Sequence, residues 1–297
     1  MFHILTHNIL PVFFMLALGF SLGRVGTISF DEARTVNRVA FLVLQPGLIF
    51  PLVAQVDIAQ FDVVALATYA LCQAFGFTLS YILARRVFRR DHLESWLLAM
   101  SVVFVNTLLY IWPISFLIYG EAASLPITAI VAWDTAFSFA FFIITTDVMA
   151  GQSQGALRRV AMNPVLIAIL LGIAVNLAAL PVPEPVLTAA KFAGAGAAPL
   201  TLFALGVILS RHALMPSPVI AGMTALKVLG FPALVWLMLG ITQPEGTWQP
   251  LFVLAAAGPS GAMAFSLAML HGIRTDAIAP VVIWTSILSL ISLSWLA

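Results

Sequence analysis

Long apolar segments alternate with short polar or turn-forming linkers along the whole chain. Ten segments are each close to the ~20 residues that a helix needs to cross a ~30 Å hydrocarbon core. We predict spans at about 8–24, 36–54, 62–84, 95–119, 124–148, 163–180, 187–209, 217–240, 249–271 and 276–296. The pattern therefore predicts an all-α polytopic membrane protein with ten transmembrane helices.

The composition supports this class. Of 297 residues, 62% are hydrophobic and 8% are charged, whereas soluble domains are nearer 45–50% apolar and 25% charged. A net charge of +1 gives no basis for a nucleic-acid partner. The single cysteine, Cys72, excludes an internal disulfide and a cysteine-rich metal site. The five histidines fall near predicted surfaces without metal-ligand spacing, so we expect no metal site.

The basic residues fall mostly on one side of the predicted membrane. Placing the loop Arg85–Glu94 in the cytoplasm puts eleven of the thirteen basic residues on that side. The linkers on the other side carry Asp57, Glu121, Glu184 and Glu245. By the positive-inside rule we predict a multi-pass inner-membrane protein with both termini outside the cytoplasm.

The ninth segment, Leu251–His271, is interrupted at Gly258–Gly261 by the sequence Gly-Pro-Ser-Gly. Proline lacks an N–H group and clashes with the carbonyl one turn back, so Pro259 is expected to break the helix. In lipid a broken helix persists only where protein or a polar cavity satisfies the backbone. The break is therefore a candidate binding site, and the alternative is a kink repaired by neighbouring helices.

Several features recur at an offset of 153 residues. The matches are Pro11 with Pro164, Gly19 with Gly172, Pro46 with Pro199, and Asn106-Thr107 with Pro259-Ser260. Each half, 1–150 and 151–297, then holds five spans. Because five is odd, the second half enters from the opposite face, which predicts a 5+5 inverted repeat of the kind that secondary transporters use.

The repeat pairs the break in span 9 with Asn106-Thr107 in the middle of span 4. Pro113 follows two turns later and is the second residue expected to break a helix. The N-terminus of a half-helix carries about half a positive charge and free N–H groups, which suit an anion. Two such termini near the midplane would favour a carboxylate.

Ionisable residues inside apolar spans are candidate functional groups, because each costs about 2.5–3.5 kcal/mol at the bilayer centre. Asp134, with Ser138 one turn on, and Lys227 fall deep in spans 5 and 8. We expect them to line a polar interior; the alternative is a purely structural ion pair. Lys191, nearer the outer end of span 7, is expected to reach the surface, and Asp147 is expected at the inner interface.

The remaining candidates are polar residues in apolar spans. Gln73 could face the crossing or pack against a neighbouring span, and Gln45 could border the substrate path. Ser260 could donate to a ligand or cap the second half-helix. The predicted substrate-binding residues are Asn106, Thr107, Gly258, Pro259, Ser260, Lys227 and Gln45. The predicted ion-coupling or core polar residues are Asp134, Ser138 and Gln73.

The chain resembles the bacterial branch of the auxin efflux carrier family, within the superfamily of bile-acid/sodium symporters. The runs FLVLQPGLIF at Phe41–Phe50, VNTLLYIWP in span 4 and AAAGPSGAMAF in span 9 carry this resemblance. It implies scaffold helices at about 8–54 and 163–209, and moving core helices at about 62–148 and 217–296 that cross at spans 4 and 9. It also implies export or exchange of small organic anions, with a homodimer through the scaffold as a further expectation.

We therefore predict a secondary active transporter of small organic anions that works by alternating access. No phosphate loop, zinc-protease helix or nucleophile elbow is present in the sequence, so we expect no enzyme and no cofactor. The coupling ion, H⁺ or Na⁺, is left open. Two rivals stand beside this reading: a sodium-coupled symporter of the bile-acid type and a non-transporting membrane receptor.

Overall fold

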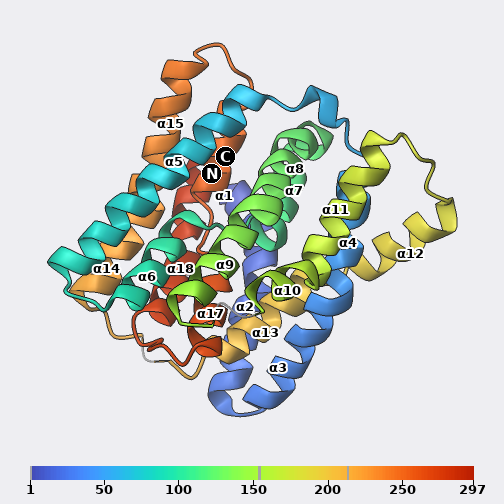
Figure 1. Cartoon of the computed structure of the whole chain (residues 1–297). Coiled ribbons are helices and arrows are strands. Elements are labelled where there is room, and N and C mark those ends of the chain that lie inside the picture. The colour runs from blue at the N-terminus through green and yellow to red at the C-terminus, as the bar shows by residue number, and fades with distance from the viewer. Residues whose placement is uncertain (1, 153–154, 213) are drawn as a thin grey trace.

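The structure is a computed structural model that describes residues 2–152, 155–212 and 214–297 (Figure 1). Within these ranges the regular structure is helical, and an isolated antiparallel bridge joins Val105 to Ser260. The all-helical fold expected from the sequence is thus confirmed.

The helices follow one another with short connections. In the first half they are α1 Phe2–Ile4, α2 Leu10–Val25, α3 Phe30–Val39, α4 Gln45–Ala54, α5 Val63–Ile82, α6 His92–Val103, α7 Trp112–Tyr119, α8 Ser124–Trp133 and α9 Phe139–Met149. In the second half they are α10 Ala156–Ala161, α11 Pro164–Leu177, α12 Glu184–Gly194, α13 Ala197–Leu209, α14 Pro218–Ala225, α15 Phe231–Thr242, α16 Gln249–Ala256, α17 Met263–Leu270 and α18 Ile278–Leu296. Short π-helical or 3₁₀ turns join several of them into longer rods: η1 Leu5–Ile9, η2 Ala40–Leu44, η3 Ile58–Gln60, η4 Leu83–Val87, η5 Thr107–Ile111, η6 Gly120–Ala123, η7 Asp134–Ser138 and η8 Leu226–Gly230.

Seven helical stretches among the described residues are long and apolar enough to cross a membrane. They are Phe2–Val25, Phe30–Ala54, Val63–Val87, Thr107–Met149, Glu184–Leu209, Pro218–Thr242 and Ile278–Leu296. The expected spans 4 and 9 are each interrupted, and α11 has only 14 residues. Length and hydropathy therefore do not confirm the count of ten, because a helix broken in the middle of the membrane fails a test for continuous length.

The second long rod begins earlier than the hydrophobic pattern indicates. Its helix α3 starts at Phe30, six residues before the predicted boundary. Ser29 and Glu32 form a capping box, in which the Ser29 N–H donates to Glu32 Oε2 over 2.8 Å. Such a box satisfies the free N–H groups of the first turn, so a polar segment extends the helix beyond its apolar part.

Glycines allow close packing between distant parts of the chain. Helix α13 packs along α2, and both α11 and α12 pack on α4. A Cβ atom on Gly19 would overlap the Phe203 carbonyl oxygen, and one on Gly206 would overlap that of Leu16. Small residues that let backbones approach are typical of helix packing in membranes. These contacts gather α2, α3, α4, α11, α12 and α13 into one group, seen at the lower right of Figure 1.

A second group of helices packs beside the first. Helix α5 contacts α6 and α15, α15 contacts α16, and α18 contacts α6, α14 and α16. Figure 1 shows α5, α14 and α15 at its left edge, with α6 and α18 nearer the centre. The interrupted helices lie in this second group.

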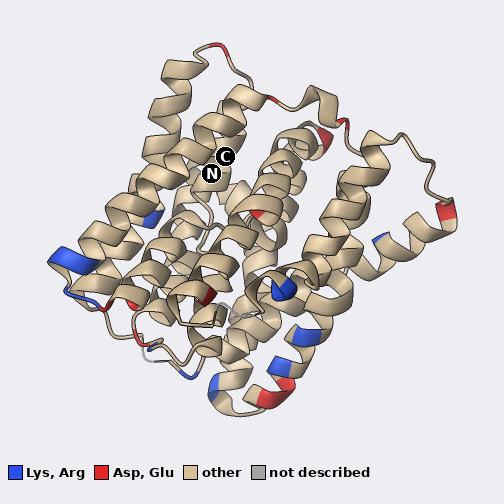
Figure 2. Ribbon diagram, in the orientation of Figure 1, with Lys and Arg blue, Asp and Glu red and all other residues tan. Residues whose placement is uncertain are grey.

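The surface fits a lipid environment. Large apolar side chains are exposed on many helices, among them Phe14 at 60%, Phe192 at 87% and Trp295 at 78%. Charged ribbon gathers at the two ends of the molecule, with most of the blue at the lower end and mainly red in the upper loops (Figure 2). An apolar waist between charged ends is what a multi-pass membrane protein presents to a bilayer.

Candidate functional site

Two interrupted helices meet at their unwound residues. Helix α6 ends at Val103 and α16 ends at Ala256. Beyond these ends the Asn106 N–H donates to the Pro259 carbonyl over 3.0 Å, and the Gly261 N–H donates to the Phe104 carbonyl over 2.8 Å. The two bonds frame the antiparallel bridge between Val105 and Ser260. Each break therefore satisfies backbone groups of the other.

Glycine is required on the span 9 side of this crossing. A Cβ atom on Gly258 would lie 2.5 Å from Ile111 Cδ1 and 2.9 Å from Val105 Cγ1. One on Gly261 would lie 2.8 Å from the Phe104 ring. Side chains at these positions would push the two unwound segments apart.

The interruption in span 4 lies before Pro113. The non-helical residues are 104–106, and Pro113 sits in the first turn of α7, directly after η5. The helical rod that begins at Thr107 continues through Pro113. The structure therefore places the break seven residues earlier than Pro113, next to Asn106.

Asp134 lies beside the crossing and is 3% exposed. Its Oδ1 accepts a hydrogen bond from Gln73 Nε2 over 2.7 Å, and its Oδ2 accepts one from the Thr107 hydroxyl over 3.2 Å. The carboxylate thus links α5 and the first residue after the break to the rod that contains α8.

Gln73 is the centre of a second set of bonds. Its Oε1 accepts from Trp133 Nε1 over 2.7 Å and from the Ser138 hydroxyl over 3.5 Å. Its Nε2 also lies 3.4 Å from the carbonyl of Val103, the last residue of α6. Gln73 therefore satisfies a free carbonyl at the end of one broken helix.

Lys227 has the corresponding place at the other broken helix. Its side chain is fully buried, and Nζ donates to the carbonyl of Ala256, the last residue of α16, over 2.7 Å. The ammonium also lies 5.0 Å from the centre of the Phe231 ring. A cation at a helix C-terminus offsets the negative end of the helix dipole. Lys227 makes no ion pair with Asp134 or with any other described residue.

Ser260 is held by its neighbours. Its hydroxyl donates to the Ser101 carbonyl over 2.5 Å, and its N–H donates to the Thr285 hydroxyl over 3.1 Å. Ser260 is 1% exposed.

Asn106 differs from Ser260, because its half-buried side chain makes no hydrogen bond to any part of the chain that the structure describes. It precedes η5, whose first N–H groups have no partner in a preceding turn.

Four of the predicted residues lie on π-helical turns. Thr107 begins η5, Asp134 begins η7 and Ser138 ends it, and Lys227 is in η8. Single π turns inside helices are frequent at functional sites. Gln45 lies elsewhere, buried in the first group of helices, where its Nε2 donates to the Thr201 hydroxyl over 3.3 Å.

Sequence reasoning missed several polar partners. Trp133 and Thr285 hold Gln73 and Ser260 in place, but as single polar residues in long apolar helices they gave no signal. Asp147 was expected at the inner interface, whereas it is fully buried, with Oδ2 2.8 Å from Arg159 and Oδ1 2.9 Å from His271. This cluster ties α9, α10 and the end of α17 together at the arginine-rich end of the molecule.

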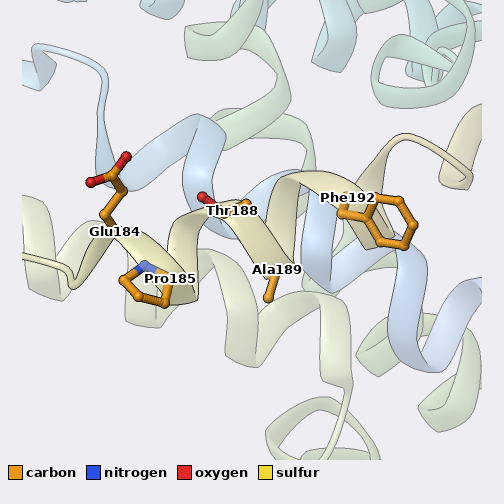
Figure 3. Close-up of a pocket in the computed structure, with 5 residues that line it drawn as sticks. All are labelled: Glu184, Pro185, Thr188, Ala189 and Phe192. Atoms are coloured by element: carbon orange, nitrogen blue, oxygen red, sulfur yellow. The ribbon is translucent and has the colours of Figure 1, made fainter.

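Two hollows accompany the helices. A cavity of about 510 Å³ lies between α4 and α12 on one side and α7 and α8 on the other. A second hollow of about 490 Å³ runs along one face of α12, where Glu184, Pro185, Thr188, Ala189 and Phe192 line it (Figure 3). All five of these residues come from one helix, so no second element encloses it.

Comparison with known proteins identifies the family. The model of a family of membrane transport proteins matches residues 4–155 and 148–296. The chain belongs to this family. The resemblance to auxin efflux carriers that its motifs indicated is thereby confirmed.

Two relatives match along almost their whole length. A protein of Methanothermobacter thermautotrophicus named "Uncharacterized transporter" is 26% identical over 298 residues, with 97% of this chain and 96% of the relative covered. A protein of Rhizobium meliloti described as a candidate malonate transporter is 23% identical over 310 residues, with 98% and 94% covered. The chain is therefore similar to transporters from end to end.

Proposed function

We propose that this protein is a secondary active transporter of small organic carboxylates, which bind where spans 4 and 9 cross. The observation that carries the proposal is the paired break, in which Asn106 and Pro259 meet by a backbone bond. Irregular backbone inside a membrane protein persists where it is buried in protein or lines a cavity, and transporters place substrates at such discontinuous helices.

We also propose that the chain spans the membrane ten times and that its two halves form an inverted repeat. The bonded residues Asn106 and Pro259 are separated by 153 positions, since 259 − 106 = 153, as the repeat requires. The capped carbonyls of Val103 and Ala256 have the same separation, since 256 − 103 = 153. Contacts also pair as a two-fold exchange predicts, because α2 with α13 corresponds to α11 with α4.

Alternating access follows from this arrangement. The first group of helices, α2–α4 and α11–α13, would form the scaffold. The second group, which holds both breaks, would move against it and expose the crossing to each side in turn. The arginine-rich end would face the cytoplasm, and copies would pair through the scaffold.

The chemistry at the crossing favours an anion. The Asn106 amide and the free N–H groups at the start of η5 are hydrogen-bond donors, and a helix N-terminus attracts negative charge. Lys227 adds a buried positive charge on the neighbouring helix. A carboxylate is negatively charged and offers oxygen atoms that can accept hydrogen bonds from these donors.

Malonate is the first substrate to test, because the name of one relative mentions it. The experiment is counterflow: purified protein in liposomes loaded with unlabelled malonate is diluted into radiolabelled malonate in potassium buffer without sodium. We expect labelled malonate to accumulate transiently, and unlabelled dicarboxylates to compete while the neutral malonamide does not.

Other outcomes of the same experiment assign the rivals. Counterflow that requires sodium would replace this proposal with a sodium-coupled symporter. No counterflow of malonate or of any tested mono- or dicarboxylate, from protein that remains folded, would favour a non-transporting receptor.

A further inference from the structure

The cavity between α4, α7, α8 and α12 contains a charge that the crossing does not use. Lys191 lines this cavity of about 510 Å³. It lies seven residues after Glu184, which begins α12, so it is about 10 Å along the helix at 1.5 Å per residue. The lysine was expected to reach the surface; it is exposed and borders this open cavity between the two groups of helices.

The Lys191 ammonium is unpaired within the described part of the chain. It makes no hydrogen bond and no ion pair with the residues that the structure describes, and its side chain is exposed. An uncompensated cation within an apolar span costs about 2.5–3.5 kcal/mol unless it is paired or wet. The stretch 184–195 around it carries one acid, Glu184, which lies two helical turns before Lys191 on the same face, about 10 Å along the helix.

The opposite wall of the cavity is aromatic and polar. Trp112 and Phe116 stack with ring centres 5.7 Å apart and an angle of 12° between their planes. Ser124, the first residue of α8, adds a hydroxyl to this wall, and Gln55, directly after α4, adds an amide on the Lys191 side. Ligand sites commonly combine an apolar wall with a few polar groups in volumes of about 300–1,000 Å³.

We infer that this cavity, here called the Lys191 vestibule, is a second binding site for an organic carboxylate with an apolar body. The carboxylate pairs with the Lys191 ammonium, Gln55 donates to it from the end of α4 on the same side of the cavity, and the apolar body lies on Trp112 and Phe116. Trp112 is six residues after Asn106, about 9 Å along the helix. The vestibule therefore holds an anion next to the crossing without belonging to it.

The identity of this anion as a transported species rests on the proposed function, but its binding does not. A reporter thiol at Ser124 measures binding directly. In a Cys72→Ala background, Ser124→Cys carries the only cysteine, and Cys72 is buried. The rate of its reaction with the neutral reagent N-ethylmaleimide is measured with and without benzoate, and with the uncharged benzyl alcohol as control.

Benzoate at four times its dissociation constant leaves about one fifth of the sites empty, so we expect labelling to slow about fivefold. Benzyl alcohol at the same concentration gives little protection. Adding Lys191→Gln weakens benzoate binding by about tenfold, the loss of one charge-assisted bond, and most of the protection disappears. Lys191→Arg retains it. Trp112→Ala weakens protection by benzoate but leaves protection by malonate, which has no apolar body, unchanged.

Equal protection by benzoate with lysine or glutamine at position 191 would overturn the proposal. So would a labelling rate that no carboxylate changes, which is the result expected if a lipid headgroup fills the cavity. Asn106→Ala separates the two sites: it should abolish malonate counterflow and keep the protection at Ser124. Protection without counterflow in the unsubstituted protein would refute the proposed transport only.

Discussion

At the scale of single residues, Gln73 and Lys227 each place a hydrogen-bond donor at the C-terminal end of one of the two broken helices. Gln73 lies against the last carbonyl of α6 and Lys227 donates to the last carbonyl of α16. A helix that stops inside the membrane leaves carbonyls that water cannot reach. These two side chains therefore stabilise the breaks that form the proposed site.

Asp134 tests how strongly this polar centre depends on charge. Asp134→Asn keeps the shape but removes the negative charge. The amide oxygen can still accept from Gln73 Nε2 and the new N–H group can donate to the Thr107 hydroxyl, so the variant tests the charge and the charge-assisted strength of these bonds. We expect the initial rate of malonate uptake to fall about tenfold or more, equivalent to roughly 1.4 kcal/mol.

The control for this variant is Glu245→Gln, which removes an exposed acid from a loop. Both proteins are reconstituted at equal amounts. Uptake by Asp134→Asn equal to that of Glu245→Gln would show that the carboxylate has no part in transport.

Lys227→Met separates a structural role from a role in transport. Methionine fills most of the space but leaves the Ala256 carbonyl without its donor, which costs about 1–3 kcal/mol. It also leaves Asp134 without a positive charge nearby. We expect a lower melting temperature and a large loss of malonate uptake.

The double variant Asp134→Asn, Lys227→Met removes both buried charges. It should recover part of the melting temperature, because the uncompensated charge is gone, and it should not recover uptake. Wild-type uptake by the double variant would mean that neither charge takes part in transport.

The residues of the candidate site were accessible from sequence to different degrees. Asp134, Lys227 and Asn106 are polar groups in long apolar segments, so their cost in a membrane made them visible. Trp133 and Ser101 are common residues in such segments, and their bonds depend on which helices pack together. Asp147 shows the same limit, since its burial depends on Arg159 and His271 from later helices.

At the scale of elements, the two breaks are stabilised by each other. The sequence indicated a break at Gly258–Gly261 from its proline and glycines, and it indicated Asn106-Thr107 from the repeat. It pointed to Pro113 as well, but the helical rod that begins at Thr107 continues through that proline. The position of the first break depends on the backbone bonds to Pro259 and Gly261, which propensity alone does not show.

Gly258→Ala tests the crossing as an element. The new methyl group would lie 2.5 Å from Ile111 Cδ1 and 2.6 Å from its Cγ1. The two segments must separate, at a cost of about 1–3 kcal/mol for such overpacking. We expect a lower melting temperature and slower uptake, both partly restored by adding Ile111→Ala.

The matched control is Gly240→Ala in α15, where the nearest atom to the new methyl group is Gln249 Nε2 at 3.3 Å, the end of a flexible side chain. A Gly258→Ala protein with the stability and uptake of the Gly240→Ala protein would contradict the close crossing.

At the scale of the whole molecule, composition and hydropathy were enough to predict an all-helical membrane protein. They did not fix how many helices cross. The span predicted at 163–180 is a helix of 14 residues in the structure, and the span predicted at 249–271 is interrupted between α16 and α17. Hydropathy measures apolar length, and it cannot report where a helix stops inside the membrane because another segment satisfies its backbone.

Substrate is expected to lie at the crossing, and a structure determined with bound ligand tests this most directly. Protein saturated with malonate should show density for the dianion in contact with the Asn106 side chain, between η5 and residues 258–261. Asn106→Ala should lose that density. Malonate density found only in the Lys191 vestibule, or bound away from both breaks under conditions that support counterflow, would contradict the account.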